Sequence, residues 1–321
     1  MRKWIKLLEA VIVLSLIVIS FISINSINQL RAARYSGSID KAHHFAIVTD
    51  EVSSYAFNKF IEGIDSIIDA HDAVFEVYEV GAQSSDAIFD MIQLTEVDGV
   101  ILKLSNNNAY SSQINAFKAN GINVVAIGND APESDRDLYV GTNKFQLGKE
   151  AAALSALATD RQGRVAVILG NEYLDDKAVA TNNFVNGLYE GVKDYESLSI
   201  STIQYSTNLR AEIIVDEILG GTETIDVIIC TDPLDVNRVM RVLVDRNMVG
   251  SIKVIANGNT PEIVEYIRKN LVYASLVEDY EELGRLSIEY LDKLNKEQVV
   301  SSYINIPIAT LKKDNLEEVQ P

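Results

Sequence analysis

The sequence has very little cysteine and histidine. A single cysteine, Cys230, among 321 residues excludes an internal disulfide and a zinc cluster built from several thiolates. The three histidines, two of them adjacent, leave little for a His-rich metal site. With only 5 Pro and 17 Gly against 47% hydrophobic residues, the composition is that of an ordinary folded protein rather than a disordered or fibrous one.

Motifs of several common enzyme classes are also missing. The sequence contains no G-x-S-x-G elbow, Walker loop or G-x-G-x-x-G turn, which carry nucleophilic or nucleotide-dependent chemistry. Cys230 lies inside an apolar run, as expected of an inert core thiol rather than a nucleophile. We therefore predict no catalytic residue, no metal and no cofactor, and a sugar-processing enzyme remains only a minor alternative.

Basic residues are too few to balance the acids. The chain has 28 Lys and Arg against 46 Asp and Glu, a net charge of −18, which argues against a nucleic-acid partner because phosphate binding requires cations. The charge is also uneven. Residues 1–34 hold five basic residues and only Glu9 as an acid, a local charge of +4, so the other 287 residues carry −22.

One long apolar run lies in the basic N-terminal segment. Leu7–Ile24 has Glu9 as its only charge, and 18 residues of helix reach about 27 Å, enough to cross a bilayer core. The preceding cations favour a cytoplasmic N-terminus. We expect residues 1–34 to be a single-pass cell-membrane anchor, with the rest of the chain extracytoplasmic. A cleaved signal peptide is the rival reading, but no small-x-small site or lipid-accepting cysteine follows; a buried helix is the third.

After a polar spacer at residues 35–43, apolar β-branched runs alternate with amphipathic stretches. Each run is too short for an isolated helix and is typical of a strand that is buried on both faces. The nine predicted strands are Phe45–Thr49, Val74–Val80, Gly99–Leu104, Val124–Ile127, Arg164–Leu169, Ser199–Tyr205, Val227–Thr231, Ile252–Ala256 and Tyr273–Val277. Strand and helix in alternation indicate βαβ units and parallel sheets.

The number of units favours two lobes. Four strand–helix units precede Gly141–Asn143 and roughly four follow, so the prediction is an α/β fold of two doubly wound Rossmann-like lobes, with a (β/α)8 barrel as the alternative. Two helix starts are marked by their caps. Asn143 is expected to cap a helix from Lys144, and Thr260 precedes a proline in a first helical turn.

Polar and aromatic residues follow the predicted strands, where doubly wound sheets bind their ligands. Carboxylates and amides bond hydroxyl groups, and aromatic faces pack on sugar C–H surfaces. The set therefore suits a neutral polyol, although any one of these residues could be only a turn former or a helix cap. The candidate ligand-binding residues are Glu51, Tyr55, Asn129, Asp130, Asn182, Thr231, Asp232, Asn257, Asn259 and Glu278.

Several segments resemble a known family. Asn129–Gly148, NDAPESDRDLYVGTNKFQLG, resembles the D-A-P-x-S-x-R…Y-V-G-T-(D/N)-N…G signature of type I periplasmic sugar-binding proteins, the ribose-binding and lactose-repressor-core type. IDVIICTD, VIANGNTPEIVEYI and LVYASLVEDYEELGRLSIEYL follow in the family's order. The resemblance covers roughly residues 44–305.

The resemblance implies three hinge crossovers between two lobes that hold the ligand between them. The crossovers are expected near Thr142-Asn143, Val277-Glu278 and Asn305–Ile308. They give an N-terminal lobe of residues 44–142 and 278–305, and a C-terminal lobe of residues 143–277 and 306–321.

The resemblance also assigns parts of the site, with departures. Asn129 and Asp130 match the first-lobe site loop, Thr231-Asp232 the second-lobe loop, and Asn257–Asn259 and Glu278 complete the set. Gly128 stands where the family has a sugar-binding Asp. The arginine usual before the second-lobe glycine motif is absent ahead of Gly187-Leu188, and Asn182 and Asn183 stand near it.

The N-terminus narrows the functional prediction. The lactose-repressor type carries a helix-turn-helix there, whereas this chain has an apolar span, so DNA binding is not expected. An anchored chain of this type resembles the sugar-sensing subunits of Gram-positive bacteria that work beside a membrane histidine kinase. We predict such a sensor of a monosaccharide or related polyol. The alternative is a solute-binding component that delivers sugar to an ABC permease.

Overall fold

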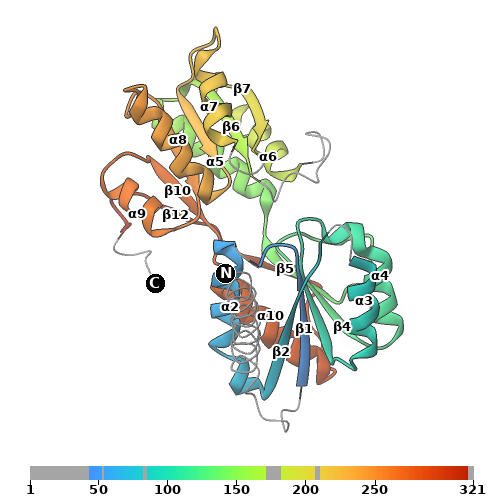
Figure 1. Ribbon diagram of the computed structural model, residues 1–321. Helices are drawn as coiled ribbons and strands as arrows, with labels where there is room; N and C mark the ends of the chain where they lie inside the picture. The colour runs from blue at the N-terminus through green and yellow to red at the C-terminus, as the bar shows by residue number, and fades with distance from the viewer. Residues whose placement is uncertain (1–42, 53, 82–84, 171–181, 207–209, 317–321) are drawn as a thin grey trace, which may run out of the picture. The chain divides into compact units, whose positions relative to one another are not determined.

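The computed structural model of the chain describes residues 43–52, 54–81, 85–170, 182–206 and 210–316 (Figure 1). The apolar segment Leu7–Ile24 lies outside these residues. Among the helices of the described ranges, none has both the length and the apolar character needed to cross a bilayer.

The described chain forms two six-stranded sheets, which confirms a two-lobed α/β architecture and excludes a single barrel. The first sheet has the order β11-β5-β4-β3-β1-β2. Its strands are β1 (His43–Thr49), β2 (Ala73–Glu79), β3 (Gly99–Lys103), β4 (Asn123–Ile127), β5 (Leu138–Thr142) and β11 (Tyr303–Ile306). The pairs β1–β3, β3–β4, β4–β5 and β5–β11 are parallel.

The second sheet repeats the plan with the order β12-β10-β9-β8-β6-β7. Its strands are β6 (Gln162–Leu169), β7 (Ser197–Tyr205), β8 (Val227–Cys230), β9 (Lys253–Asn257), β10 (Ala274–Val277) and β12 (Ala309–Leu311). β12 runs antiparallel to β10, whereas the other pairs are parallel. The carboxyl ends of the parallel strands therefore share one edge of each sheet.

Helices cover both faces of the first sheet (Figure 1). Alternate residues of β1 point to opposite faces. Phe45 and Ile47 pack with α2 and α10, and Ala46 and Val48 pack with α3 and α4. The helical segments of this lobe are α2 (Tyr55–Asp65), η1 (Ile68–His71), α3 (Ser85–Leu94), η2 (Asn107–Tyr110), α4 (Ser111–Ala119) and α10 (Tyr280–Asn295).

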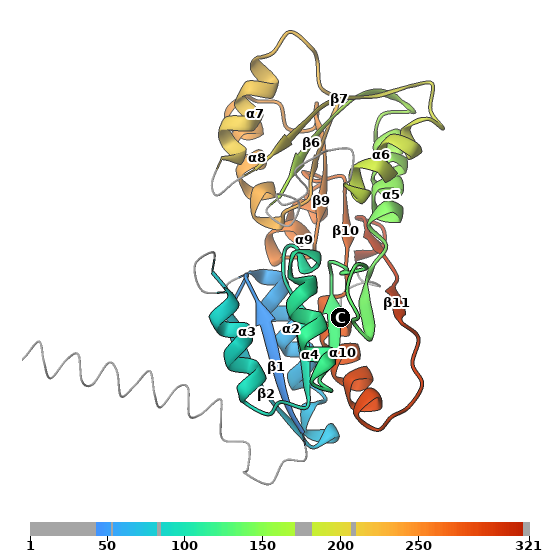
Figure 2. The ribbon, with the colours of Figure 1, turned by 90° about the vertical axis from the view of Figure 1, so that its right-hand side faces the viewer.

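The second sheet is also enclosed on both faces, which explains why its strands read as continuous apolar runs. Figure 2 shows α5 and α6 on one side of β6 and α7 and α8 on the other, and two separate cores fill the two sides. The helices are α5 (Lys144–Ala158), α6 (Asn183–Val192), α7 (Ala211–Gly220), α8 (Pro233–Asp245) and α9 (Pro261–Arg268).

Glycines bring two helix pairs into backbone contact, one pair in each lobe. A Cβ atom on Gly63 of α2 would lie 1.9 Å from the Glu281 carbonyl oxygen of α10, and one on Gly148 of α5 would lie 2.0 Å from the Phe184 oxygen of α6. Any side chain there would force the helices apart. The two lobes therefore share a packing device as well as a topology.

The chain passes between the sheets after β5, after β10 and after β11. Asn143 caps α5 by accepting from the Gln146 amide at 3.0 Å, as the sequence predicts. Thr260 likewise caps α9, accepting from the Ile263 amide at 3.3 Å. These caps fix where the helices begin, directly beside the strand ends that carry the candidate site.

Candidate ligand site

Polar side chains gather at the carboxyl ends of the strands in each lobe. Those of the first lobe, together with Lys144 and Glu278 from two of the crossovers, line a small cavity of about 30 Å³, which is room for roughly two water molecules. We call its charged and polar members the first-lobe cluster: Glu51, Lys103, Ser105, Asn129, Lys144 and Glu278. By itself this cavity is too small to enclose a sugar.

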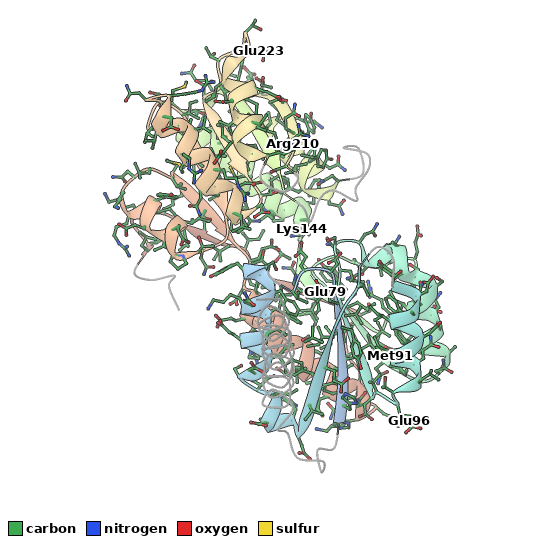
Figure 3. All side chains as sticks on the ribbon, in the orientation of Figure 1. Glu79, Met91, Glu96, Lys144, Arg210 and Glu223 are labelled. Carbon is green, nitrogen blue, oxygen red and sulfur yellow. The ribbon has the colours of Figure 1, made fainter. Side chains whose placement is uncertain are left out.

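A buried ion pair is the central feature of the first-lobe cluster. Lys144 Nζ lies 2.9 Å and 3.1 Å from the two carboxylate oxygens of Glu278, and the side chains are only 15% and 2% exposed. Lys144, labelled in Figure 3, begins α5, whereas Glu278 follows β10. The pair therefore joins two of the three crossovers, and Glu278 offsets the unfavourable position of a cation at a helix N-terminus.

A second pair makes the first-lobe cluster electrically neutral. Lys103 Nζ lies 3.7 Å from a Glu51 carboxylate oxygen, with side chains 13% and 27% exposed. Two cations and two anions thus line the cavity. A ligand with a net charge would leave one of these partly buried charges uncompensated, so the arrangement favours a neutral ligand that offers hydroxyl groups.

Two residues predicted at this site are held by bonds within the lobe. The Asn129 side-chain amide donates to the Leu104 and Ser105 carbonyl oxygens at 3.2 Å and 2.9 Å, which ties the loops after β3 and β4 together. Asp130 forms a bidentate ion pair with Arg136, whose Nη2 donates to Asp130 Oδ2 at 2.8 Å. Asn129 still lines the cavity, whereas the Asp130 carboxylate is bound to an arginine of the same loop.

Gly128 stands where the family resemblance predicts an aspartate, and its backbone conformation disfavours that residue. Its φ is +73°, a backbone conformation that residues other than glycine rarely adopt. Its carbonyl accepts from the Tyr139 hydroxyl at 2.8 Å. Burial raises the pKa of that hydroxyl, so it remains a donor. An aspartate at this position would therefore be strained.

Tyr55 and Asn259, both predicted ligand residues, contact each other. The Tyr55 hydroxyl, at the start of α2, donates to Asn259 Oδ1 at 3.1 Å. Asn259 follows β9 of the second sheet, so this bond joins the two lobes. Burial raises the pKa of Tyr55, and the hydroxyl keeps its proton for the bond at neutral pH.

In the second lobe, Thr231, Asp232 and Asn257 form a connected group at the ends of β8 and β9, which we call the second-lobe cluster. Thr231 Oγ1 accepts from the Gly170 amide at 2.8 Å, and the Asn257 amide donates to the Thr231 carbonyl at 3.2 Å. Asp232 caps α8 by accepting from the Leu234 amide at 2.8 Å. These residues therefore lie at the strand ends, as predicted, and they also stabilise the local turns and the start of α8.

Two buried asparagines keep a polar atom without a partner among the described residues. Asn257 is 5% exposed and its Oδ1 accepts no hydrogen bond there. Asn182 is fully buried, caps α6 by accepting from the Val185 amide at 3.1 Å, and leaves its Nδ2 unpaired. Unpaired buried polar atoms cost about 1–3 kcal/mol each. A ligand hydroxyl can both donate and accept, so it could satisfy either atom.

Sequence reasoning missed both lysines of the first-lobe cluster. Lys103 is the last residue of β3 and Lys144 the first residue of α5. A cation at the end of an apolar run was the available signal for Lys103 only. The described residues hold no group of three or more His, Cys, Asp or Glu that could bind a metal. Cys230 is fully buried, and burial raises its pKa, in keeping with the predicted inert thiol.

Comparison with known proteins places this geometry in context. A family model described as "Periplasmic binding protein domain" matches residues 45–298. None of the curated proteins matches the chain. Among solved structures, a glucose-galactose binding protein, GanP of Geobacillus stearothermophilus, is 22% identical with a TM-score of 0.76 over 86% of this chain and 99% of its own.

Two further solved structures share the fold. An ABC transporter solute-binding protein of Burkholderia graminis, in complex with D-arabinose, is 20% identical with a TM-score of 0.80, over 88% of this chain and 100% of its own. The XylFII-LytSN complex contains a chain that is 23% identical with a TM-score of 0.74, over 85% of this chain and 98% of that chain.

Proposed function

The chain belongs to the periplasmic binding protein domain family, and from this premise we propose that it is a membrane-anchored extracytoplasmic receptor for a monosaccharide or related polyol. Two buried atoms that have no hydrogen-bond partner among the described residues, Asn182 Nδ2 and Asn257 Oδ1, are the observation that carries the proposal. They stand at the strand and helix ends where this fold binds ligands, and a sugar hydroxyl supplies what each atom lacks.

The charges of the first-lobe cluster support a neutral sugar. The Lys103–Glu51 and Lys144–Glu278 pairs cancel, so the cluster attracts neither a sugar acid nor an amino sugar by charge. Its cavity holds only roughly two waters. In the proposal, the second-lobe cluster therefore completes the enclosure of the ligand, and the hinges permit the lobes to close on it.

The anchor part of the proposal rests on the sequence. Leu7–Ile24 has the length of a membrane span, and the +4 segment before a −22 remainder gives the orientation. Each of the ten predicted ligand residues then lies on the extracytoplasmic side.

Signalling is proposed to run through lobe closure to a membrane histidine kinase. Sugar can drive such a signal only through a higher affinity for one arrangement of the lobes. The solved XylFII-LytSN complex supports a protein partner, since it contains a chain of this fold assembled with a second protein.

Delivery of sugar to an ABC permease is the second candidate. It is favoured by the Burkholderia graminis neighbour, which is described as an ABC transporter solute-binding protein. A sugar-processing enzyme is a third and weaker possibility, because the family and these neighbours are binding proteins. Turnover of a bound sugar, seen as product by NMR, would be needed to support it.

A thermal-shift panel tests the sugar proposal. The full chain, purified in a mild detergent, is heated with pentoses, hexoses and related polyols at millimolar concentration. At least one neutral sugar should raise the melting temperature by mass action. If no member of a broad panel raises it, the sugar proposal fails.

Cell fractionation and partner capture separate the two binding roles. A receptor with an intact Met1 region should stay in the membrane fraction and be cross-linked to a histidine kinase in a sugar-dependent manner. A processed, soluble chain that is cross-linked to a permease would instead establish the transport role.

A further inference from the structure

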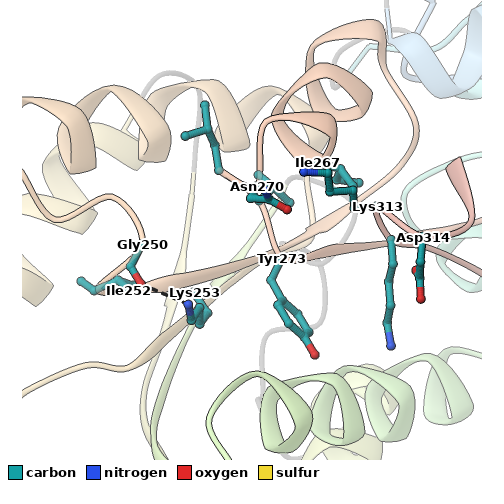
Figure 4. A pocket seen from close by; sticks show the side chains of 11 residues that line it. Gly250, Ile252, Lys253, Ile267, Asn270, Tyr273, Lys313 and Asp314 are labelled. Atoms are coloured by element: carbon teal, nitrogen blue, oxygen red, sulfur yellow. Dashed lines mark hydrogen bonds between the residues drawn. The ribbon is translucent and has the colours of Figure 1, made fainter.

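A second cavity lies at the opposite edge of the second sheet from the candidate ligand site. Its volume is about 460 Å³, within the range of small-molecule sites. It is built where β9 and β10 begin and where the antiparallel strand β12 ends (Figure 4). The parallel strands that reach the candidate site at their carboxyl ends therefore border this cavity at their amino ends.

The cavity is basic although the chain is strongly acidic. Lys253, Lys312 and Lys313 line it together with one acid, Asp314, which gives the lining a net charge of +2 in a chain of −18. Within the described ranges, none of these lysines lies within ion-pairing distance of a carboxylate. By contrast, Lys118 pairs with Asp137 at 2.6 Å and Lys144 with Glu278 at 2.9 Å.

Two of the lysines are held in place around the cavity. Lys253 Nζ donates to the Gly250 carbonyl at 3.1 Å, and Lys312 Nζ stands 6.0 Å from the centre of the Tyr273 ring. Gly250 and Tyr273 also line the cavity. Because these two lysine side chains already interact with other lining groups, they lose less conformational entropy when a ligand binds than free surface lysines would.

The kind of cation indicates the kind of anion. Arginine presents a planar fork that matches a flat carboxylate, whereas lysine is a compact point charge with rotatable donors. The lining has lysine and no arginine. Ammonium groups from separate positions suit a tetrahedral phosphate group, which carries about −1.5 to −2 charge and three acceptor oxygens.

The cavity has room for more than a phosphate. The Tyr273 ring and the apolar side chains of Ile267 and Leu271 form part of its wall, and Asn270 contributes an amide. We propose that this cavity is a second binding site, separate from the sugar site, that takes the phosphate monoester of a small organic molecule. The phosphate lies among the three lysines and the organic part lies against Tyr273.

Calorimetric titration of the full chain tests the site. The probes are inorganic phosphate, glycerol 1-phosphate, and citrate, a tricarboxylate whose negative charge is at least as large, all at constant ionic strength so that general screening is equal. Glycerol 1-phosphate should bind at least tenfold more tightly than citrate and more tightly than inorganic phosphate. Equal affinity for citrate, or no measurable heat with glycerol 1-phosphate, overturns the proposal.

A charge-matched pair of variants locates the binding. K312Q/K313Q removes two cations from the cavity, and K193Q/K293Q removes two cations elsewhere, at the C-cap of α6 and on α10. The first should weaken glycerol 1-phosphate at least tenfold and leave sugar affinity unchanged, and the second should change neither. Equal weakening in both variants would show a general charge effect and contradict the site. Retained sugar binding in K312Q/K313Q keeps this result distinct from a failure of the sugar proposal.

Discussion

Breaking the Lys144–Glu278 pair should be strongly destabilising, because both side chains are largely removed from water. In K144M, the Glu278 carboxylate, 2% exposed, loses its cation. In E278Q, the Lys144 ammonium, 15% exposed, loses its anion. Removing one partner of a buried pair typically costs about 3–5 kcal/mol, because the remaining charge stays buried without compensation.

The expected size can be expressed as a melting temperature. For a domain of 150–250 residues, each 1 kcal/mol shifts the melting temperature by about 2–4 °C. Each single variant should therefore melt at least about 6 °C below the wild type in differential scanning calorimetry. K144M/E278Q removes both charges, so it should melt well above the value obtained by adding the two single losses.

The control is a pair of the same chemistry at the surface. Lys193 and Glu190 are 2.6 Å apart but 70% and 50% exposed, so E190Q should have the melting temperature of the wild type. If K144M and E278Q also melt within about 2 °C of the wild type, or if the double variant shows the full sum of the single losses, the buried-pair argument is refuted.

Three further predictions concern packing, pH and the thiol. G148V should lower the melting temperature by more than the conservative helix variant A153V, because a Cβ atom at Gly148 would lie 2.0 Å from the Phe184 oxygen; equal melting would contradict the close helix contact. For Asp292, burial alone would raise the carboxyl pKa, but hydrogen bonds from Lys296 and His71 outweigh it and lower the pKa. The stability lost in D292N should therefore be greatest at pH values above the ordinary carboxyl pKa of 3.8, and it should shrink as the pH falls through the lowered pKa of the folded state. Thermal unfolding of the wild type and D292N at several pH values measures this loss. A loss that does not change with pH would reject the coupling. Cys230 is fully buried, and burial raises its pKa, so a thiol reagent at pH 8 should label it only after urea unfolding; rapid labelling of the native chain would disprove the buried assignment.

Much of the fold is readable in the sequence because both sheets are buried on both faces. All nine runs predicted as strands are strands in the structure, with ends that differ by at most two residues. The pattern missed β5, β11 and β12. β11 and β12 have only four and three residues and lie at sheet edges, so their strand geometry comes from pairing with distant segments rather than from local apolar character.

The candidate site was less readable because strand-end position does not reveal side-chain partners. Asp130 was a reasonable ligand residue by position, yet Arg136, six residues along, occupies its carboxylate. That pair lies inside the D-A-P-x-S-x-R segment, so the signal was present but its geometry was not. Lys144 gave no comparable signal, since its partner Glu278 is 134 residues away and only the folded crossovers bring the two together.

Calorimetric titration of the sugar found in the thermal-shift panel tests the central claim most directly. The wild type, N182A, N257A and the control N120A, whose asparagine is exposed at the end of α4, are titrated as full chains. Each of Asn182 and Asn257 is expected to bond a sugar hydroxyl, so N182A and N257A should bind at least about tenfold more weakly, and N120A should bind as the wild type. Wild-type affinity in both N182A and N257A would contradict a sugar held by these buried amides.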